Sequence, residues 1–78
     1  MTPHRSIIYI HLLDEGTTVW LPTEGEIVDE MIFKVLPTEN YDPENEHWEF
    51  PPGTIVRCEK LVLHDIQAKE VLVAVYNV

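Results

Sequence analysis

Short stretches of β-branched and aromatic residues alternate along the chain with turn-forming residues, which predicts strands rather than helices. The clearest stretches are residues 6–13, 17–22, 54–63 and 70–76, each too short for a typical helix. The last of them is apolar on both faces, and an exposed strand of that kind invites aggregation. We therefore expect residues 70–76 to lie centrally in a sheet or to pair with a second copy of the chain.

The stretch 54–63 carries a clear two-residue period. Arg57 and Glu59 alternate with Val56 and Cys58, and alternate residues of a strand point to opposite faces of its sheet. Cys58 is therefore expected in the core as a packing residue, without a nucleophilic role. As the only cysteine, it cannot form an internal disulfide.

Turn signals separate the strands. Turns are expected at residues 14–16, at 23–26 after a strand ended by Pro22, at 51–53, and at 64–68 as a hairpin connection. In the Pro-Pro-Gly of residues 51–53, the second proline presets φ and the glycine supplies positive φ, as a type II turn requires.

The region between the second and third turns is ambiguous. Residues 30–36 read as a strand, entered through a short strand or a bulge at 26–28, with Asp29-Glu30 as an interruption. A helix over 24–36 is the alternative. Phe33 and the flanking prolines favour the strand.

A long loop at residues 37–47 leads into the sequence Trp48-Glu49-Phe50, a short strand or the approach to one. Alternation places both rings on one face and Glu49 on the other. Aromatic residues on a loop are typical of binding surfaces. The alternative is that both rings plug the end of a barrel, with Trp20 beside them. The candidate partner-binding residues are Trp20, Tyr41, Asp42, Glu44, Glu46, Trp48 and Phe50.

Five to six short strands without a convincing helix predict a small all-β fold, an SH3-like barrel or roll, with an OB-type barrel as the less favoured alternative. The chain of 78 residues is expected to form one domain over 1–78, with a flexible N-terminus at 1–5. A domain of this size supports only a thin core, so dimerisation through the C-terminal strand would be a natural supplement.

The charge is strongly acidic and unevenly placed. The chain carries 14 Asp and Glu against 5 Lys and Arg, a net charge of -9, and residues 14–51 hold 11 of the acids with one base. Such a region repels phosphates and attracts basic surfaces. We expect a protein partner, one with a basic surface, and no nucleic acid.

No catalytic or metal-binding pattern emerges from the sequence. The acids that alternate from Asp42 fail the EF-hand pattern, because His47 and Gly53 stand at its sixth and twelfth positions. The four histidines lack metal-motif spacing. We expect no enzyme, no cofactor and no metal. No stretch has the length of a membrane span or the form of a signal peptide, so we expect a cytoplasmic protein that does not bind membranes.

Two stretches carry a family resemblance: Leu13-Asp-Glu-Gly-Thr-Thr-Val-Trp-Leu-Pro22 and Glu46-His-Trp-Glu-Phe-Pro-Pro-Gly-Thr-Ile-Val-Arg-Cys-Glu59. With the C-terminal Leu-Val-Ala-Val, the chain from about residue 8 resembles a group of short uncharacterised bacterial proteins of SH3-like barrel appearance. The resemblance implies the fold and no functional residue. The chain lacks the Ala-Leu-Tyr-Asp-Tyr motif of SH3 peptide-binding domains.

These observations favour a non-enzymatic interaction module that presents an acidic aromatic loop at residues 38–50. The alternative is an acidic inhibitor, or nucleic-acid mimic, that occupies a basic site on its partner. A third hypothesis is a nucleic-acid-binding barrel with stacking aromatics, against which the local charge argues.

Overall fold

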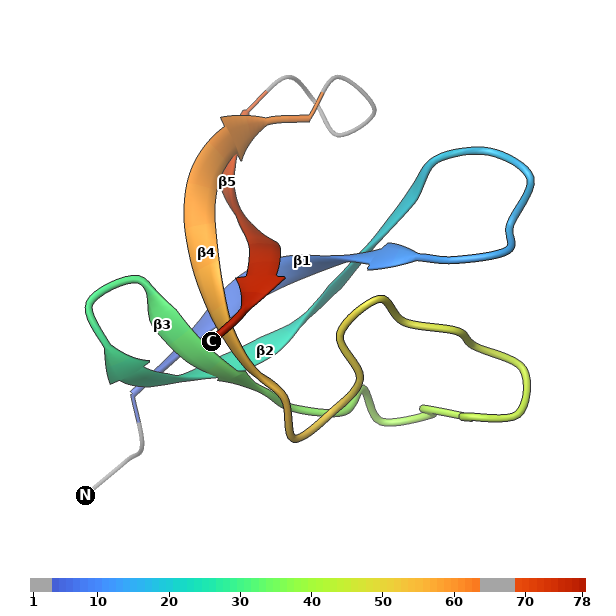
Figure 1. Ribbon diagram of the computed structural model, residues 1–78, viewed down its shortest axis with the longest axis horizontal. Coiled ribbons are helices and arrows are strands. Elements are labelled where there is room, and N and C mark those ends of the chain that lie inside the picture. Colours follow the sequence, from blue (N-terminus) through green and yellow to red (C-terminus); the bar gives the residue numbers. More distant parts are fainter. Residues whose placement is uncertain (1–3, 64–68) are drawn as a thin grey trace.

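Five strands follow one another around a closed barrel in the computed structural model, which describes residues 4–63 and 69–78 (Figure 1). They are β1 (Arg5–Leu12), β2 (Val19–Asp29), β3 (Ile32–Val35), β4 (Ile55–Val62) and β5 (Glu70–Asn77). The predicted small all-β barrel is confirmed. Sequential neighbours pair throughout, so the sheet is a meander and not the Greek key of an OB-type barrel.

The barrel closes through a short parallel contact between β1 and β5. Consecutive strands are antiparallel, so the first and fifth strands point the same way. Only Ile8 with Leu72 and Tyr9 with Val73 are paired across this closure. At these residues β5 therefore lies between β4 and β1, which is the central place expected for it.

Beyond Tyr9, the edge of β1 that faces away from β2 is taken by residues 47–49. Leu12 forms a bridge with Trp48. The main-chain N–H of Leu13 donates to the carbonyl of His47 at 2.7 Å, and that of Glu49 donates to His11 at 2.9 Å. This isolated bridge thus fixes the end of the long connection between β3 and β4 against β1.

The turn expected at residues 23–26 is wrong, because β2 continues through them. Pro22 alternates with Glu24, whose carbonyl accepts a bond from the N–H of Leu36 at 3.0 Å. The nitrogen of Pro22 therefore faces the β3 side of β2, and pairing with β3 begins only at Gly25. A proline at this place removes no ladder bond.

Gly25 is a packing glycine inside a strand rather than a turn glycine. A Cβ built at this residue would lie 2.8 Å from Ile8 Cδ1 and 3.2 Å from Phe33 Cβ. Ile8 is fully buried. Because Gly25 has no side chain, Ile8 of β1 and Phe33 of β3 can pack directly against the main chain of β2.

The interruption at Asp29-Glu30 is a hairpin turn between β2 and β3. Asp29 pairs with Ile32, with a register shift between Ile27 and Asp29 that matches the expected bulge. Met31 in the turn has φ of 60°. The helix considered over 24–36 is excluded, and the strand expected from residue 30 begins at Ile32.

The turn before β4 is confirmed. Gly53 has φ of 95°, and the N–H of Thr54 donates to the carbonyl of Pro51 at 3.1 Å. The hairpin connection expected at 64–68 lies outside the described residues, as do residues 1–3 of the expected flexible N-terminus. The paired region begins before residue 6, since the carbonyl of His4 already accepts a bond from Ile27 at 2.9 Å.

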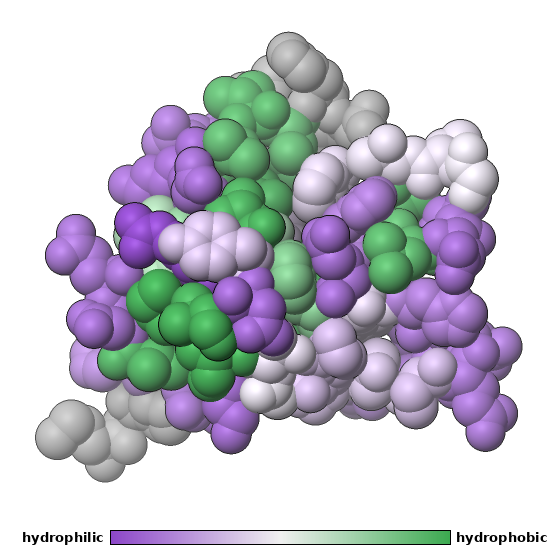
Figure 2. Space-filling model, in the orientation of Figure 1, coloured by the Kyte–Doolittle hydropathy of each residue, from purple (hydrophilic) through white to green (hydrophobic). Residues whose placement is uncertain are grey.

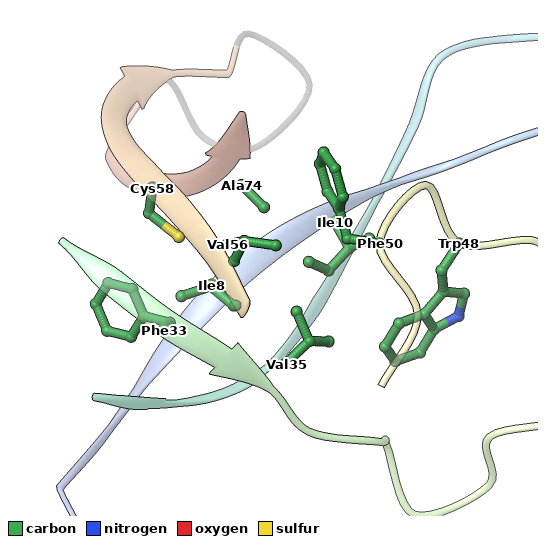
Figure 3. Packing of buried hydrophobic residues seen from close by; sticks show 9 residues of the cluster. All are labelled: Ile8, Ile10, Phe33, Val35, Trp48, Phe50, Val56, Cys58 and Ala74. Carbon is green, nitrogen blue, oxygen red and sulfur yellow. The ribbon is translucent and has the colours of Figure 1, made fainter. Parts of the chain in front are cut away.

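Nine buried side chains form the core (Figure 3). The predicted alternation of β4 is confirmed, because Val56 and Cys58 are fully buried while Arg57 and Glu59 are exposed. Two core members, Trp48 and Phe50, come from the long connection between β3 and β4 rather than from a strand. Figure 3 shows Trp48 beside the trace of that connection. The core members are Ile8, Ile10, Phe33, Val35, Trp48, Phe50, Val56, Cys58 and Ala74.

Candidate functional site: the acidic end of the barrel

Two connections meet at one end of the barrel, residues 13–18 between β1 and β2 and residues 36–54 between β3 and β4 (Figure 1). They hold seven of the 14 acids and neither lysine nor arginine. Nδ1 of His47 lies 2.9 Å from Oδ2 of Asp14 and ties the two connections together. We call the carboxylates of these connections the acidic end: Asp14, Glu15, Glu39, Asp42, Glu44, Glu46 and Glu49.

A single capped turn organises residues 42–46. The carbonyl of Asp42 accepts the N–H of Glu46 at 2.8 Å, and its Oδ1 accepts the N–H of Glu44 at 3.0 Å. Oε2 of Glu46 accepts the N–H of Asp42 at 2.8 Å. Pro43 suits the first position of such a turn because no donor is needed there. Asp42 and Glu46 thus build the loop with their carboxylates.

Trp48 anchors this loop to the core. Its side chain is 5% exposed, and its Nε1 donates to Oε1 of Glu46 at 3.3 Å. The ring of Tyr41 packs edge-on against it, with centroids 4.8 Å apart. Phe50 is buried as well. Of the two interpretations of these rings, the structure supports the one in which Trp48 and Phe50 plug the barrel end.

The expectation that Trp20 lies beside those rings is wrong, because it lies on the outer face of the barrel. It precedes the core-packed Leu21, so alternation along β2 turns it outward, and it pairs with His11 across the β1–β2 ladder. The two rings are 5.1 Å apart at a tilt of 39°. The sequence analysis missed this pair and the contact of Asp14 with His47. The predicted turn at 14–16 would place His11 opposite Val19, whereas the observed register places it opposite Trp20.

The acids available to a partner are fewer than the sequence suggested. Glu15 between β1 and β2, and Glu39, Glu44 and Glu49 between β3 and β4, are exposed, and their carboxylates accept no hydrogen bond from any residue that the structure describes. Asp42 and Glu46 are half-buried and engaged. Of the predicted binding residues, only Glu44 is an exposed carboxylate free for a partner. Trp20 lies elsewhere, and the other five are buried or engaged in holding the loop: Tyr41, Asp42, Glu46, Trp48 and Phe50.

Few other chemical features are present within residues 4–63 and 69–78. No cavity opens there, and no three His, Cys, Asp or Glu side chains lie close enough to hold a metal ion. Burial raises the pKa of the Cys58 thiol to about 11. The thiol is therefore protonated and poorly nucleophilic at neutral pH.

The chain matches no family model, no curated protein and no solved structure in the comparisons. The resemblance to short bacterial proteins accordingly stays a prediction. Over the part of the chain that the structure covers, no helix has the length and apolar character needed to cross a bilayer.

Proposed function

We propose that this protein is an interaction module whose acidic end binds a basic surface of another protein. One observation carries the proposal: seven carboxylates with no lysine or arginine among them occupy two connections that are joined at one end of the barrel. Like charges held together oppose folding. An oppositely charged partner would relieve that repulsion.

The loop is suited to binding because it is already ordered. Trp48, Tyr41 and the capped turn hold the main chain in place. Little conformational entropy would then be lost on association. The exposed carboxylates of Glu39, Glu44 and Glu49 give long-range attraction and specificity rather than a large apolar contact. We therefore expect fast, salt-sensitive binding of moderate affinity.

The distribution of the other acids supports this proposal over a nucleic-acid mimic, which needs its acids in one stripe. Six further described acids lie outside the acidic end, on β2, the β2–β3 turn, β4 and β5. These six acids are Glu24, Glu26, Asp29, Glu30, Glu59 and Glu70.

Absence of catalytic activity and a cytoplasmic location stay predictions for this chain.

The test compares two variants of equal charge. One neutralises Glu39, Glu44 and Glu49 to glutamine, and the control neutralises Glu30, Glu59 and Glu70, which are also exposed. Each is immobilised and offered cell extract at about 50 mM salt, where surface charges act over roughly 15 Å. Partners retained by the wild type are identified by mass spectrometry and titrated against all three proteins.

We expect the control to retain the partner and the acidic-end variant to lose it, with wild-type affinity falling as salt rises. If both variants retain the partner equally, the acidic end is not the surface that binds it. Tight binding of RNA by the isolated wild type at low salt would instead favour the nucleic-acid-binding hypothesis.

A further inference from the structure

β5 has an unpaired edge over its C-terminal half. β4 pairs with it from Glu70 to Asn77, but β1 pairs only at Leu72 and Val73. From Ala74 onward, no main-chain hydrogen bond joins β5 to any described segment other than β4. Residues 47–49 occupy the β1 edge that β5 leaves.

The fold protects a comparable edge elsewhere. The N-terminal half of β2 extends past β3, and there Pro22 removes a donor and Glu24 carries a charge. Residues 74–77 contain neither proline nor a charged side chain. Such an edge is open to pairing with another strand.

The edge strand itself is uncharged and mostly apolar, while the neighbouring β4 carries the exposed Arg57 opposite Tyr76. Tyr76 is 52% exposed and Val78 is 65% exposed, and residues 71–78 carry no ionisable acid or base other than tyrosine. Hydrophobic side chains gather on this side of the molecule, near the end of β5 (Figure 2). Residues 52–78 hold three acids and three bases and are neutral as a whole.

We infer that this edge pairs with the same edge of a second copy, antiparallel and about a two-fold axis. A two-fold contact places a surface against itself. Two copies of a chain with charge -9 repel each other least when they meet at a segment that carries no charge. Residues 74–77 at the edge of β5 form such a segment. The edge satisfies its main-chain groups in the dimer, as in β-strand addition.

The contact is small. The register shift between β4 and β5 leaves Val75 as an extra residue in β5, which bends the strand and shortens any new ladder. The dimer is therefore weak and forms at high concentration. Because the dimer rests on apolar and main-chain contacts, raising the salt concentration strengthens it or leaves it unchanged. Binding of a partner at the acidic end, in contrast, weakens as the salt concentration rises.

Sedimentation velocity on the purified chain alone tests the inference, at concentrations up to about 1 mM, the range of weak association. The variant Tyr76→Lys places a charge at the edge, and Val28→Lys is the control at an exposed apolar residue of β2. We expect the wild type and the control to dimerise alike, and Tyr76→Lys to dimerise at least about tenfold more weakly.

Amide exchange provides a second measurement on the unmodified chain. Amides of residues 74–77 should gain protection as concentration rises, while those of β3 stay constant. A wild type that stays monomeric throughout, equal loss in both variants, or unchanged protection at 74–77 would each overturn the inference. Since no partner protein is present, the result is independent of the function proposed for the acidic end.

Discussion

Glu46 accepts a hydrogen bond from the indole Nε1 of Trp48 at 3.3 Å, and its other carboxylate oxygen accepts the N–H of Asp42 at 2.8 Å. One acid thus satisfies the polar atom of a core tryptophan and closes the turn above it. Glu44, two residues earlier, has an exposed carboxylate without such a role.

Replacing Glu46 with alanine should lower the free energy of unfolding by about 1–3 kcal/mol, because a buried donor is left without its acceptor. Glu44→Ala removes the same charge and should change stability by no more than about 0.5 kcal/mol. Urea unfolding followed by circular dichroism measures both. Equal effects of the two substitutions would show that the bonds of Glu46 are not stabilising.

Gly25→Ala should destabilise the protein by about 1–3 kcal/mol, because the new Cβ overpacks a site next to fully buried Ile8. The Cδ1 atom of Ile8 lies 2.8 Å from that Cβ, and Ile8→Val removes it. In a double-mutant cycle, Gly25→Ala should therefore cost less when Ile8→Val is already present. Additive losses in urea unfolding would contradict the close approach as the cause.

Cys58 should make stability fall at alkaline pH. Burial raises the thiol pKa from 9.0 to about 11, so between these values the unfolded chain has lost a proton that the folded chain keeps. Stability is fully present below pH 9 and declines through pH 11, by about 2–3 kcal/mol in total. Unfolding of Cys58→Ala over the same pH range serves as the reference for every alkaline effect that does not involve the thiol. Parallel pH profiles of the two proteins would rule out the thiol.

Salt should stabilise the protein by relieving repulsion at the acidic end. Raising NaCl from about 0.05 M to about 0.5 M should increase the free energy of unfolding in urea by an amount on the order of 1 kcal/mol. Neutralising Glu39, Glu44 and Glu49 should reduce this increase more than neutralising Glu30, Glu59 and Glu70. The same increase in both variants would mean that the repulsion is spread over the whole surface.

Local patterns in the sequence were enough to predict much of the fold. The alternation around Val56 and Cys58 and the turn at Pro51-Pro52-Gly53 were interpreted correctly because neighbouring residues determine both. Pro22 and Gly25 were misread as marking a turn. Their actual roles depend on where β3 begins and on the position of Ile8, and neither is a property of the local sequence.

The candidate site shows the same division. Alternation correctly placed Trp48 and Phe50 together, since both join the core. A two-residue period does not say which face is the inner one, so burial of the rings had to come from the three-dimensional arrangement. The roles of Asp42 and Glu46 likewise depend on turn hydrogen bonds that charge counting does not reveal.

The parallel contact of β1 with β5 has a consequence for how the chain folds during synthesis. Ile8 is among the first strand residues to leave the ribosome, and its partner Leu72 is among the last. The β1–β2 and β2–β3 hairpins can form early from local contacts, but the ring of strands stays open until β5 has emerged. Closure is then a late, non-local step, which should make folding slow for so small a barrel.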